Sequence, residues 1–409
     1  MRRVVVVGAS LAGVHAVEAL RERGYTGEIV LVSGEETLPY DRPPLSKSAL
    51  LDQARFDDLA LRPPQWYEQQ GVRLLLRSRA TGLDLAGRVV ALADGSVVEF
   101  DGLVIATGAA PRPLPLPCPD GLRVHQLRTL ADARGLAAAM VPGRHLVVVG
   151  AGFIGLEVAS TARQLGLEVT VLEAASAPLN RVFGTAVGGW FRRLHEHHGV
   201  TVRCGSPPEA VETSGNGVRV RLRDGSRISA DLVLAGVGAG PVTGWLQGSG
   251  LDIADGVRCR PDLATGVPGV VAAGDVARWH NRLFGEEMRV EHWTNAVEQG
   301  RHAAATLLGA REPYCPVPYF WTDQFDAKVR VVGRVDPGGE VAWEREDDTS
   351  LVVVFGREGV VQGAVCVNAP KRLAHYRRAI ADRVAWRDLA RDLEPVAPSA
   401  SVDRGDGGW

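Results

Sequence analysis

The stretch VVVVGASLAG, residues 4–13, decides the fold of the amino-terminal part of the chain. Its four valines predict a buried strand, because β-branched residues favour strands, and Gly8 predicts a tight turn after it. Gly8, Ser10 and Gly13 match the dinucleotide fingerprint G-x-G-x-x-G, with serine in place of the middle glycine. That position normally lets a pyrophosphate approach the backbone. The stretch alone predicts either a nucleotide site or a plain strand–turn–helix.

A second stretch, VVVGAGFIG at residues 147–155, repeats the pattern with all three glycines. After each fingerprint the pattern predicts a helix (11–23 and 154–165) and then a strand (28–32 and 168–172). The first glycines of the two fingerprints are Gly8 and Gly150, a spacing far longer than that of a solenoid repeat. The repetition therefore predicts duplication of a whole βαβ-containing unit.

Carboxylates stand at the ends of these following strands, where a dinucleotide site binds the adenosine ribose. Glu35, with Glu36 as its neighbouring rival, serves the first site, and Glu173 serves the second. A carboxylate at Glu173 repels a 2′-phosphate, and Ala174 and Ala175 offer no cation for one. NADH is therefore favoured over NADPH.

Composition restricts the class of protein. A chain of 409 residues predicts more than one domain, and 45% hydrophobic with 23% charged residues is typical of a soluble globular protein. The net charge of -2 gives no global basic field for nucleic acid, and no apolar run approaches the roughly 20 residues of a membrane span. Five scattered cysteines without a CxxC pair favour reduced thiols in a cytoplasmic protein over a disulfide framework, a redox dithiol or a metal cluster.

The rest of the chain continues the alternation of strands and helices. Further strands are predicted at 3–7, 145–149 and 232–235, with paired strands near 218–222, and further helices at 130–140 and 296–308. The proline-rich end of FDGLVIATGAAPRPLPLP, residues 100–117, marks a domain boundary. From 313 the pattern is rich in strands, basic helices follow around 371–391, and 396–409 has the composition of a disordered end.

The sequence HEHH at residues 195–198 allows two interpretations, a metal site or a helix end. No acidic or cysteine partner lies nearby to complete a metal site, so a solvated end of an amphipathic helix is expected, and no metal is assigned.

The two fingerprints occur in order with LPYDRPPLSK (38–47), IATGAAPR (105–112) and AAGDVA (272–277). With these motifs the chain, from Arg3 to near Pro395, resembles the FAD-dependent NADH:ferredoxin reductases of oxygenase systems, the putidaredoxin reductase family. The resemblance implies an α/β fold with two Rossmann-like, glutathione-reductase-type dinucleotide-binding domains and a C-terminal α+β interface domain. The expected divisions are an FAD domain (1–112 and 241–312), an NADH domain (113–240) and an interface domain (313–395).

The resemblance also implies site residues. FAD would be bound by Gly8, Ser10, Leu11, Ala12, Gly13, Glu35, Arg42, Lys47, Ala80, Ala106, Thr107, Gly108, Arg128, Gly274, Asp275 and Trp293. NADH would be bound by Gly150, Gly152, Phe153, Ile154, Gly155, Glu173 and Gly238. Lys47, Glu157 and Trp293 would be catalytic: Glu157 faces the nicotinamide, Trp293 lies beside the isoalloxazine, and Lys47 pairs with Glu157 near the flavin. The chain departs from the family pattern at Ser10 and at Ala239 and Gly240 of GVGAGP.

Disulfide reductases of this fold carry a cysteine pair beside the flavin, whereas the corresponding segment here reads Pro43, Pro44, Leu45, Ser46 and Lys47. The implied acceptor is therefore external, a [2Fe–2S] ferredoxin that feeds a cytochrome P450 or a Rieske oxygenase. The alternatives are an NADH oxidase, a rubredoxin reductase, or an NADH-sensing flavoprotein without turnover.

A protein of this net charge needs a local basic face to meet an acidic ferredoxin. Arg301 matches a position that the family uses for docking, Arg62 is a second candidate, and APKRLAHYRR (369–378) offers further cations. The alternative is that these arginines are solvated or form intramolecular ion pairs. Monomer and homodimer both stay open.

Overall fold

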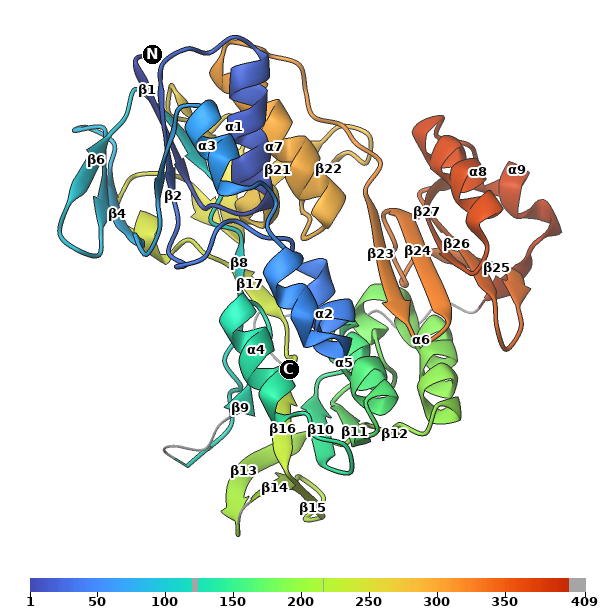
Figure 1. Ribbon diagram of the computed structural model, residues 1–409. Coiled ribbons are helices and arrows are strands. Elements are labelled where there is room, and N and C mark those ends of the chain that lie inside the picture. The colour runs from blue at the N-terminus through green and yellow to red at the C-terminus, as the bar shows by residue number, and fades with distance from the viewer. Residues whose placement is uncertain (120–123, 216, 397–409) are drawn as a thin grey trace. The chain divides into compact units, whose positions relative to one another are not determined.

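The computed structural model describes residues 1–119, 124–215 and 217–396 (Figure 1). The chain divides into two compact units. The first comprises Met1–Asp41, Asp57–Ala110 and Ala239–Pro318, and the second comprises Arg42–Phe56, Pro111–Gly238 and Tyr319–Trp409. The finer domain boundaries expected from the sequence stay a prediction. The expected disordered tail, 396–409, lies outside the described residues except for its first position.

The first unit is built on a parallel sheet, and the valine run of the first fingerprint forms one of its strands. Its order is β20 (Val270–Ala272), β7 (Gly102–Ile105), β1 (Arg3–Val7), β2 (Glu28–Val32) and β3 (Val72–Leu75). Val4 and Val6 pack into the core that holds helices α1 (Leu11–Glu22) and α7 (Trp293–Leu307), and Val5 and Val7 pack into the core on the other face. Because both faces are buried, the strand needs no polar alternation, which explains the unbroken valine run.

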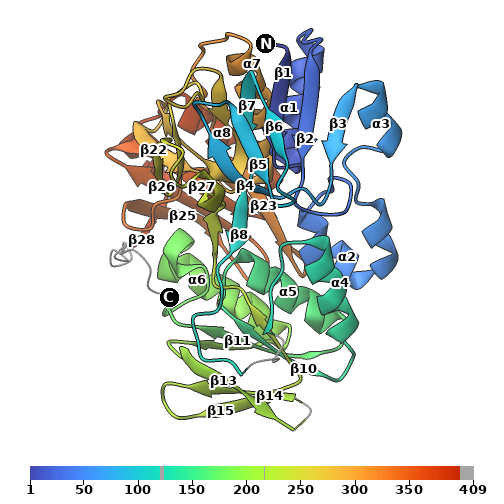
Figure 2. The ribbon, with the colours of Figure 1, turned by 90° about the vertical axis from the view of Figure 1, so that its left-hand side faces the viewer.

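Two smaller sheets, one antiparallel and one mixed, also belong to the first unit, together with the short helix α3 (Pro64–Gln69). One contains β4 (Ala80–Asp84), β5 (Val89–Leu92) and β6 (Val97–Glu99) (Figure 2). Its Leu83, Val90 and Val98 share the core of Val5 and Val7. The other has the order β18 (Ile253–Ala254), β19 (Gly256–Cys259), β21 (Ala277–Asn281) and β22 (Glu286–Arg289).

The second unit repeats the parallel arrangement. Its sheet has the order β12 (Thr201–Cys204), β11 (Glu168–Glu173), β10 (His145–Val149), β16 (Leu232–Ala235) and β9 (Val124–His125). In both sheets the fingerprint strand pairs with the strand that follows on one side and with a much later strand on the other. Ligands of open α/β sheets bind where the strand order reverses in this way. The duplication predicted from the two fingerprints is therefore present.

Helices and a small antiparallel sheet surround this second parallel sheet (Figure 2). The helices are α4 (Leu130–Ala139), α5 (Phe153–Gln164) and α6 (Asn180–His197), and the small sheet contains β13 (Pro208–Ser214), β14 (Gly217–Leu222) and β15 (Arg227–Ala230). Val218 and Val220 of β14 pack in one cluster with Val147 and Val149 of β10.

The carboxyl-terminal part of the second unit is a six-stranded antiparallel sheet. Its order is β23 (Tyr319–Gln324), β24 (Ala327–Gly333), β27 (Val360–Val367), β26 (Leu351–Arg357), β25 (Glu340–Glu346) and β28 (Glu394–Val396). Helix α8 (Pro370–Ala381) packs on β24 and β27, and the short helix α9 (Trp386–Leu389) follows (Figure 1). This arrangement agrees with the expected run of strands and then basic helices.

Most predicted elements are found within a few residues, and the strands at 3–7, 28–32, 145–149 and 232–235 have the predicted bounds. Helix α7 begins at Trp293, earlier than the predicted 296, so Trp293 is its first helical residue. Within the described ranges, no helix has the length and apolar character needed to cross a membrane.

The prediction of a solvated helix end at HEHH is wrong for His195. Helix α6 does end at His197, but His195 has no exposed surface, and its Nε2 lies 2.9 Å from Oε1 of Gln324. Phe325, just after β23, stacks on His198 with ring centroids 3.9 Å apart. The end of β23 therefore covers this face of α6, a contact that the local sequence does not reveal.

Candidate functional site

The first fingerprint loop needs two of its glycines for the fold itself. Gly8 has φ +111°, and a Cβ there would lie 2.1 Å from the Ala106 carbonyl oxygen. A Cβ on Gly13 would lie 1.9 Å from the Gly8 carbonyl oxygen. Any side chain would therefore push α1 away from β1 or the loop away from β7, and the N-terminus of α1 is fixed beside the end of β1.

Ser10 occupies the one fingerprint position that does not need glycine for the fold. Its backbone is extended, with φ -126° and ψ -160°, and it is the N-cap of α1 without a side-chain capping bond. Its counterpart Gly152 is also extended, at φ -80° and ψ -180°, and a Cβ there would meet no nearer atom than the Gly236 oxygen at 3.9 Å. A side chain at this position thus affects only what approaches the helix N-terminus.

Glu35, rather than its rival Glu36, is held at the end of β2. Tyr40 Oη donates to Glu35 Oε2 at 2.6 Å, and Glu35 is partly buried. Glu36 forms an exposed ion pair with Arg77 at 2.7 Å. The geometry therefore favours Glu35 as the fixed carboxylate beside the first fingerprint.

The other residues predicted for FAD in the first unit follow parallel strands of the same sheet. The segment Ala106, Thr107 and Gly108 follows β7, while Gly274 and Asp275 follow β20. Since carboxyl ends of parallel strands share one edge, these loops lie at the same edge as the fingerprint. Leu11 and Ala12 belong to the first turn of α1, and Ala80 opens β4.

The loop after β20 and helix α7 both lie in close contact with α1. The Gly274 N–H donates to Gln299 Oε1 at 2.8 Å, and a Cβ on Gly274 would lie 2.9 Å from Ala12 Cβ. A Cβ on Gly300 would lie 2.3 Å from the Ala12 carbonyl oxygen. Trp293 begins the helix, and its indole Nε1–H donates to Asp41 Oδ1 at 2.8 Å.

The second fingerprint repeats this geometry in the second unit. Gly150 has φ +99°, and a Cβ there would lie 2.4 Å from the Gly236 oxygen. A Cβ on Gly155 would lie 2.3 Å from the Gly150 oxygen. Gly238 has φ +101° and open space beside it. In the first turn of α5, Ile154 is 43% exposed, an unusual position for a large apolar side chain.

Glu173 is fixed through both carboxylate oxygens. The Ala151 N–H donates to Oε2 at 2.8 Å, and the Ala175 N–H donates to Oε1 at 2.8 Å. Phe153, the first residue of α5, packs edge-on against Phe183, with ring centroids 5.6 Å apart. A carboxylate oxygen accepts more than one hydrogen bond, so Glu173 keeps acceptor capacity beside the fingerprint.

Arg42 and Arg128, predicted for FAD, lie together in the second unit. Arg42 NH1 donates to the Arg128 carbonyl oxygen at 2.5 Å. Thr129 and Asp132 form a capping box at the start of α4, and Asp132 also accepts from the Arg128 N–H at 3.2 Å. The guanidinium of Arg42 therefore fixes the backbone that enters α4.

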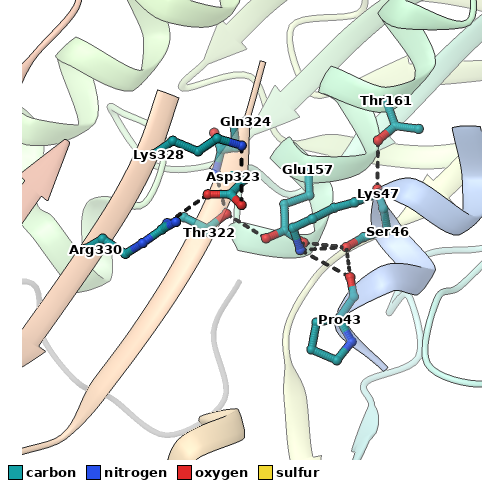
Figure 3. A network of polar contacts seen from close by, with 10 residues as sticks. All are labelled: Pro43, Ser46, Lys47, Glu157, Thr161, Thr322, Asp323, Gln324, Lys328 and Arg330. Atoms are coloured by element: carbon teal, nitrogen blue, oxygen red, sulfur yellow. Dashed lines mark hydrogen bonds and ion pairs between the residues drawn. The ribbon is translucent and has the colours of Figure 1, made fainter. Parts of the chain in front are cut away.

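Lys47 and Glu157 form the ion pair that was expected. Lys47 Nζ lies 2.7 Å from Glu157 Oε2, which also accepts from Ser46 Oγ at 2.5 Å (Figure 3). Thr322 Oγ1 of β23 donates to the other oxygen, Glu157 Oε1, at 2.6 Å. Thr161 Oγ1 donates to the Ser46 carbonyl at 2.8 Å, which ties the lysine segment to α5.

Several of these partners were missed by sequence reasoning. Sequence reasoning gave no functional role to Ser46 of the segment LPYDRPPLSK. Thr322 lies in β23, far from Glu157 along the chain. Tyr40 and Asp41 lie within LPYDRPPLSK, the motif that was singled out, and that motif was their only signal.

The docking candidates Arg62 and Arg301 meet at one acidic residue of α1. Arg62 pairs with Glu18, and Arg301 pairs with Glu22 and has NH1 3.9 Å from Glu18. Their side chains are 36% and 43% exposed. These four residues, the α1 ion-pair cluster, match the expected alternative of intramolecular pairing, and docking stays a proposal.

The five cysteines, all within the described residues, are free. Burial raises the pKa of Cys259 and of Cys366 to about 12, and it also raises the pKa of Cys118 and Cys204. Among the residues that the structure places, no cluster of three or more His, Cys, Asp or Glu residues has metal-binding geometry.

Family models match most of the chain. Residues 2–300 match the pyridine nucleotide-disulphide oxidoreductase family, and residues 319–394 match the reductase C-terminal family.

Curated relatives and solved structures agree with this match. The chain is 37% identical to the anthranilate 1,2-dioxygenase system ferredoxin–NAD(+) reductase component of Burkholderia cepacia, over 92% of this chain and 93% of that protein. It is 35% identical to putidaredoxin reductase of Pseudomonas putida, over 93% and 92%. It superposes on the covalent putidaredoxin reductase–putidaredoxin complex with a TM-score of 0.89 at 34% identity, covering 94% of each chain. The chain therefore belongs to the pyridine nucleotide-disulphide oxidoreductase family, among the ferredoxin–NAD(+) reductase components of oxygenase systems.

Proposed function

We propose that the chain is an FAD-containing reductase that passes electrons from NADH to a [2Fe–2S] ferredoxin, which supplies a cytochrome P450 or a Rieske oxygenase. The observation that carries the proposal is the pair of fingerprints, each with a fixed carboxylate (Glu35 and Glu173), in a chain whose cysteines are unpaired. The relatives named above are ferredoxin reductases of oxygenase systems, in agreement with it.

The state of the thiols argues for an external acceptor. The thiolate is the reactive form of cysteine, and burial keeps Cys259 and Cys366 protonated at neutral pH because it raises their pKa to about 12. With every cysteine free, an internal disulfide is not available to take up electrons. Electrons from the cofactor must therefore leave the protein.

The first unit has the residues to hold FAD. The N-terminus of α1 carries no acidic residue in its first turn, and the N–H groups of a helix N-terminus suit a pyrophosphate that approaches over Ser10. Glu35 would accept from the adenosine ribose, and Asp275 would accept from the ribityl hydroxyls. When bound, FAD accepts a hydride and releases electrons singly.

The second unit has the residues to hold NADH. The N-terminus of α5 likewise lacks acidic residues, and Glu173 would accept from the ribose while repelling a 2′-phosphate. Glu157 is proposed to face the nicotinamide. Lys47 is proposed to hold the carboxylate of Glu157 and to place its ammonium charge near the flavin.

Ferredoxin docking is proposed at Arg301 and Arg62, through exchange of their present partners for acidic groups of the ferredoxin. In the second unit, helix α8 offers Lys371 and Arg377 as separate candidates, and both are exposed. A cytoplasmic location fits five free thiols. Monomer and homodimer are both compatible with the proposal.

The test is a comparison of electron acceptors with the purified flavoprotein and NADH. A [2Fe–2S] ferredoxin from a relative's oxygenase system should be reduced much faster than rubredoxin or oxygen. Faster turnover with rubredoxin or with oxygen would replace the proposal by the corresponding alternative. Negligible turnover with every acceptor, despite NADH binding, would point to a sensing role.

A further inference from the structure

A buried line of polar side chains runs from α6 through β23 to Glu157. His195 and Gln324 have no exposed surface, Thr322 is 1% exposed and Glu157 is 6% exposed. His195 Nε2 lies 2.9 Å from Gln324 Oε1, and Gln324 Nε2 lies 3.2 Å from Thr322 Oγ1. Thr322 Oγ1 is 2.6 Å from Glu157 Oε1, at the Lys47 ion pair (Figure 3).

The chemistry of the two ends fixes the direction of every hydrogen bond. Glu157, paired with the Lys47 ammonium, is a carboxylate and accepts only. The single hydroxyl proton of Thr322 must therefore point to Glu157. Thr322 Oγ1 can then only accept from its other neighbour, which the amide NH₂ of Gln324 provides. The carbonyl oxygen of Gln324 consequently faces His195, which must donate from Nε2.

The opposite direction fails at Glu157. With the Gln324 amide reversed, its oxygen would face Thr322 Oγ1 and take the hydroxyl proton. The lone pairs of Thr322 Oγ1 and Glu157 Oε1 would then face each other across 2.6 Å without a proton between them. Buried polar groups left without a partner are costly, so one arrangement is selected.

The His195 ring agrees with this arrangement. Burial lowers its pKa to about 4, so the ring is neutral near pH 7 and has one N–H. Nδ1 is buried and has no hydrogen-bond partner among the described residues. A buried N–H without an acceptor is rarer than a buried acceptor without a donor, so Nδ1 is the unprotonated nitrogen. The proton therefore belongs on Nε2.

We propose that His195, Gln324 and Thr322 are positioning residues that hold the Glu157 carboxylate in one orientation for hydride transfer from the nicotinamide. The role in hydride transfer rests on the proposed function, whereas the direction of the hydrogen bonds does not. Glu157 and Lys47, the latter 22% exposed, form the accessible end of the line, and the imidazole forms its buried end.

The first test is the tautomer of His195 in the holoprotein. Nitrogen NMR with ring-labelled histidine, assigned with His195→Gln, should show a protonated Nε2 and an unprotonated Nδ1. A proton on Nδ1 would overturn the proposed direction whatever the catalytic activity is. This measurement tests the hydrogen-bond direction separately from the role in hydride transfer, because it needs no reduction by NADH.

The second test is kinetic. Thr322→Val keeps the shape and removes the hydroxyl, so it should slow the saturating rate of flavin reduction by NADH about tenfold or more with little change in NADH binding. Thr322→Ser should restore most of the rate. Ser160→Ala is the matched control, because Ser160 Oγ accepts from the Phe325 N–H at 2.7 Å and links α5 to the end of β23 outside the line.

Equal rates in the wild type, Thr322→Val and Ser160→Ala would overturn the positioning role. So would equal losses in Thr322→Val and Ser160→Ala, because they would mean that only packing between α5 and β23 matters. A wild type that NADH does not reduce would instead contradict the proposed function, and the tautomer would still decide the hydrogen-bond direction.

Discussion

Lys47 Nζ lies 2.7 Å from Glu157 Oε2, and the side chains are 22% and 7% exposed. A carboxylate so deeply buried needs a cation or several donors to remain charged, and Glu157 has Lys47, Ser46 and Thr322. The pair joins the proline-rich segment 38–47 to α5, two stretches that lie far apart in the sequence.

The first prediction concerns the cation of this pair. Lys47→Met should slow flavin reduction by NADH at least about tenfold, equivalent to about 1.4 kcal/mol in the barrier, because Glu157 loses its charged partner. Stopped-flow absorbance measures the rate. Lys328→Met is the control, since Lys328 is 58% exposed and its Nζ lies 3.6 Å from Asp323 Oδ2. A rate in Lys47→Met equal to that of the control would remove Lys47 from the reaction.

The second prediction concerns FAD retention. Asp275→Ala should lower the flavin content of purified protein, because the ribityl hydroxyls would lose a charged acceptor worth about 1.5–3 kcal/mol. The ratio of flavin to protein absorbance gives the result. Asp252→Ala, at a 66% exposed carboxylate of the same unit, should leave that ratio unchanged. Full flavin content in Asp275→Ala would count against the assignment.

The third prediction concerns the altered fingerprint. Because Ser10 is extended and makes no capping bond, Ser10→Gly should change unfolding free energy by only a few tenths of a kcal/mol. FAD affinity should also change little, since serine is small and its hydroxyl can reach a phosphate oxygen. Ser10→Val should lose FAD, because a branched apolar side chain blocks that approach. Titration of each apoprotein with FAD measures the affinity. Equal FAD affinity in the wild type, Ser10→Gly and Ser10→Val would mean that no phosphate approaches the backbone at Ser10.

The fourth prediction concerns the choice of nicotinamide cofactor. Glu173→Ala with Ala174→Arg should shift kcat/KM towards NADPH, because repulsion of the 2′-phosphate is removed and a cation is added. Ala174→Arg alone should shift it less while Glu173 remains. If the wild type already oxidises NADPH as fast as NADH, the role given to Glu173 is wrong.

The fifth prediction concerns docking. Arg301→Glu should lower ferredoxin reduction at low salt and leave ferricyanide reduction unchanged, because a small anion needs no docking face. The wild-type rate should fall with salt, since the Debye length shrinks from about 10 Å at 0.1 M to about 3 Å at 1 M. Glu22→Gln should raise the low-salt rate by releasing Arg301 from its present ion pair.

Arg258→Glu, the same charge change at an arginine that is 46% exposed on β19, is the control for this prediction. If Arg301→Glu and Arg258→Glu reduce ferredoxin equally well, the α1 ion-pair cluster is not the docking face.

Local patterns predicted the parts of the fold that local forces determine. Runs of valine buried on both faces gave the bounds of β1 and β10, and a glycine was required wherever a loop approaches a neighbouring carbonyl, as at Gly8 and Gly150. The repeated fingerprint predicted the duplication of a βαβ-containing unit, and the two parallel sheets confirm it.

Contacts between distant segments could not be predicted in this way. Thr322 reaches Glu157 only because β23 packs on α5, and the same strand end buries His195, which a pattern of local polarity placed in solvent. Arg62 and Arg301 lie far apart in sequence, yet both meet Glu18. The Arg301 contact depends on how α7 packs on α1, and the Arg62 contact on how the segment before α3 lies against α1; a helix pattern specifies neither.

The most direct measurement is an anaerobic single turnover of the purified protein. NADH added at one equivalent per chain should bleach the bound FAD, and two equivalents of oxidised [2Fe–2S] ferredoxin added next, one for each electron, should restore the flavin absorbance while becoming reduced. Failure of NADH to bleach the flavin, or a reduced flavin that ferredoxin leaves unchanged, would contradict the account.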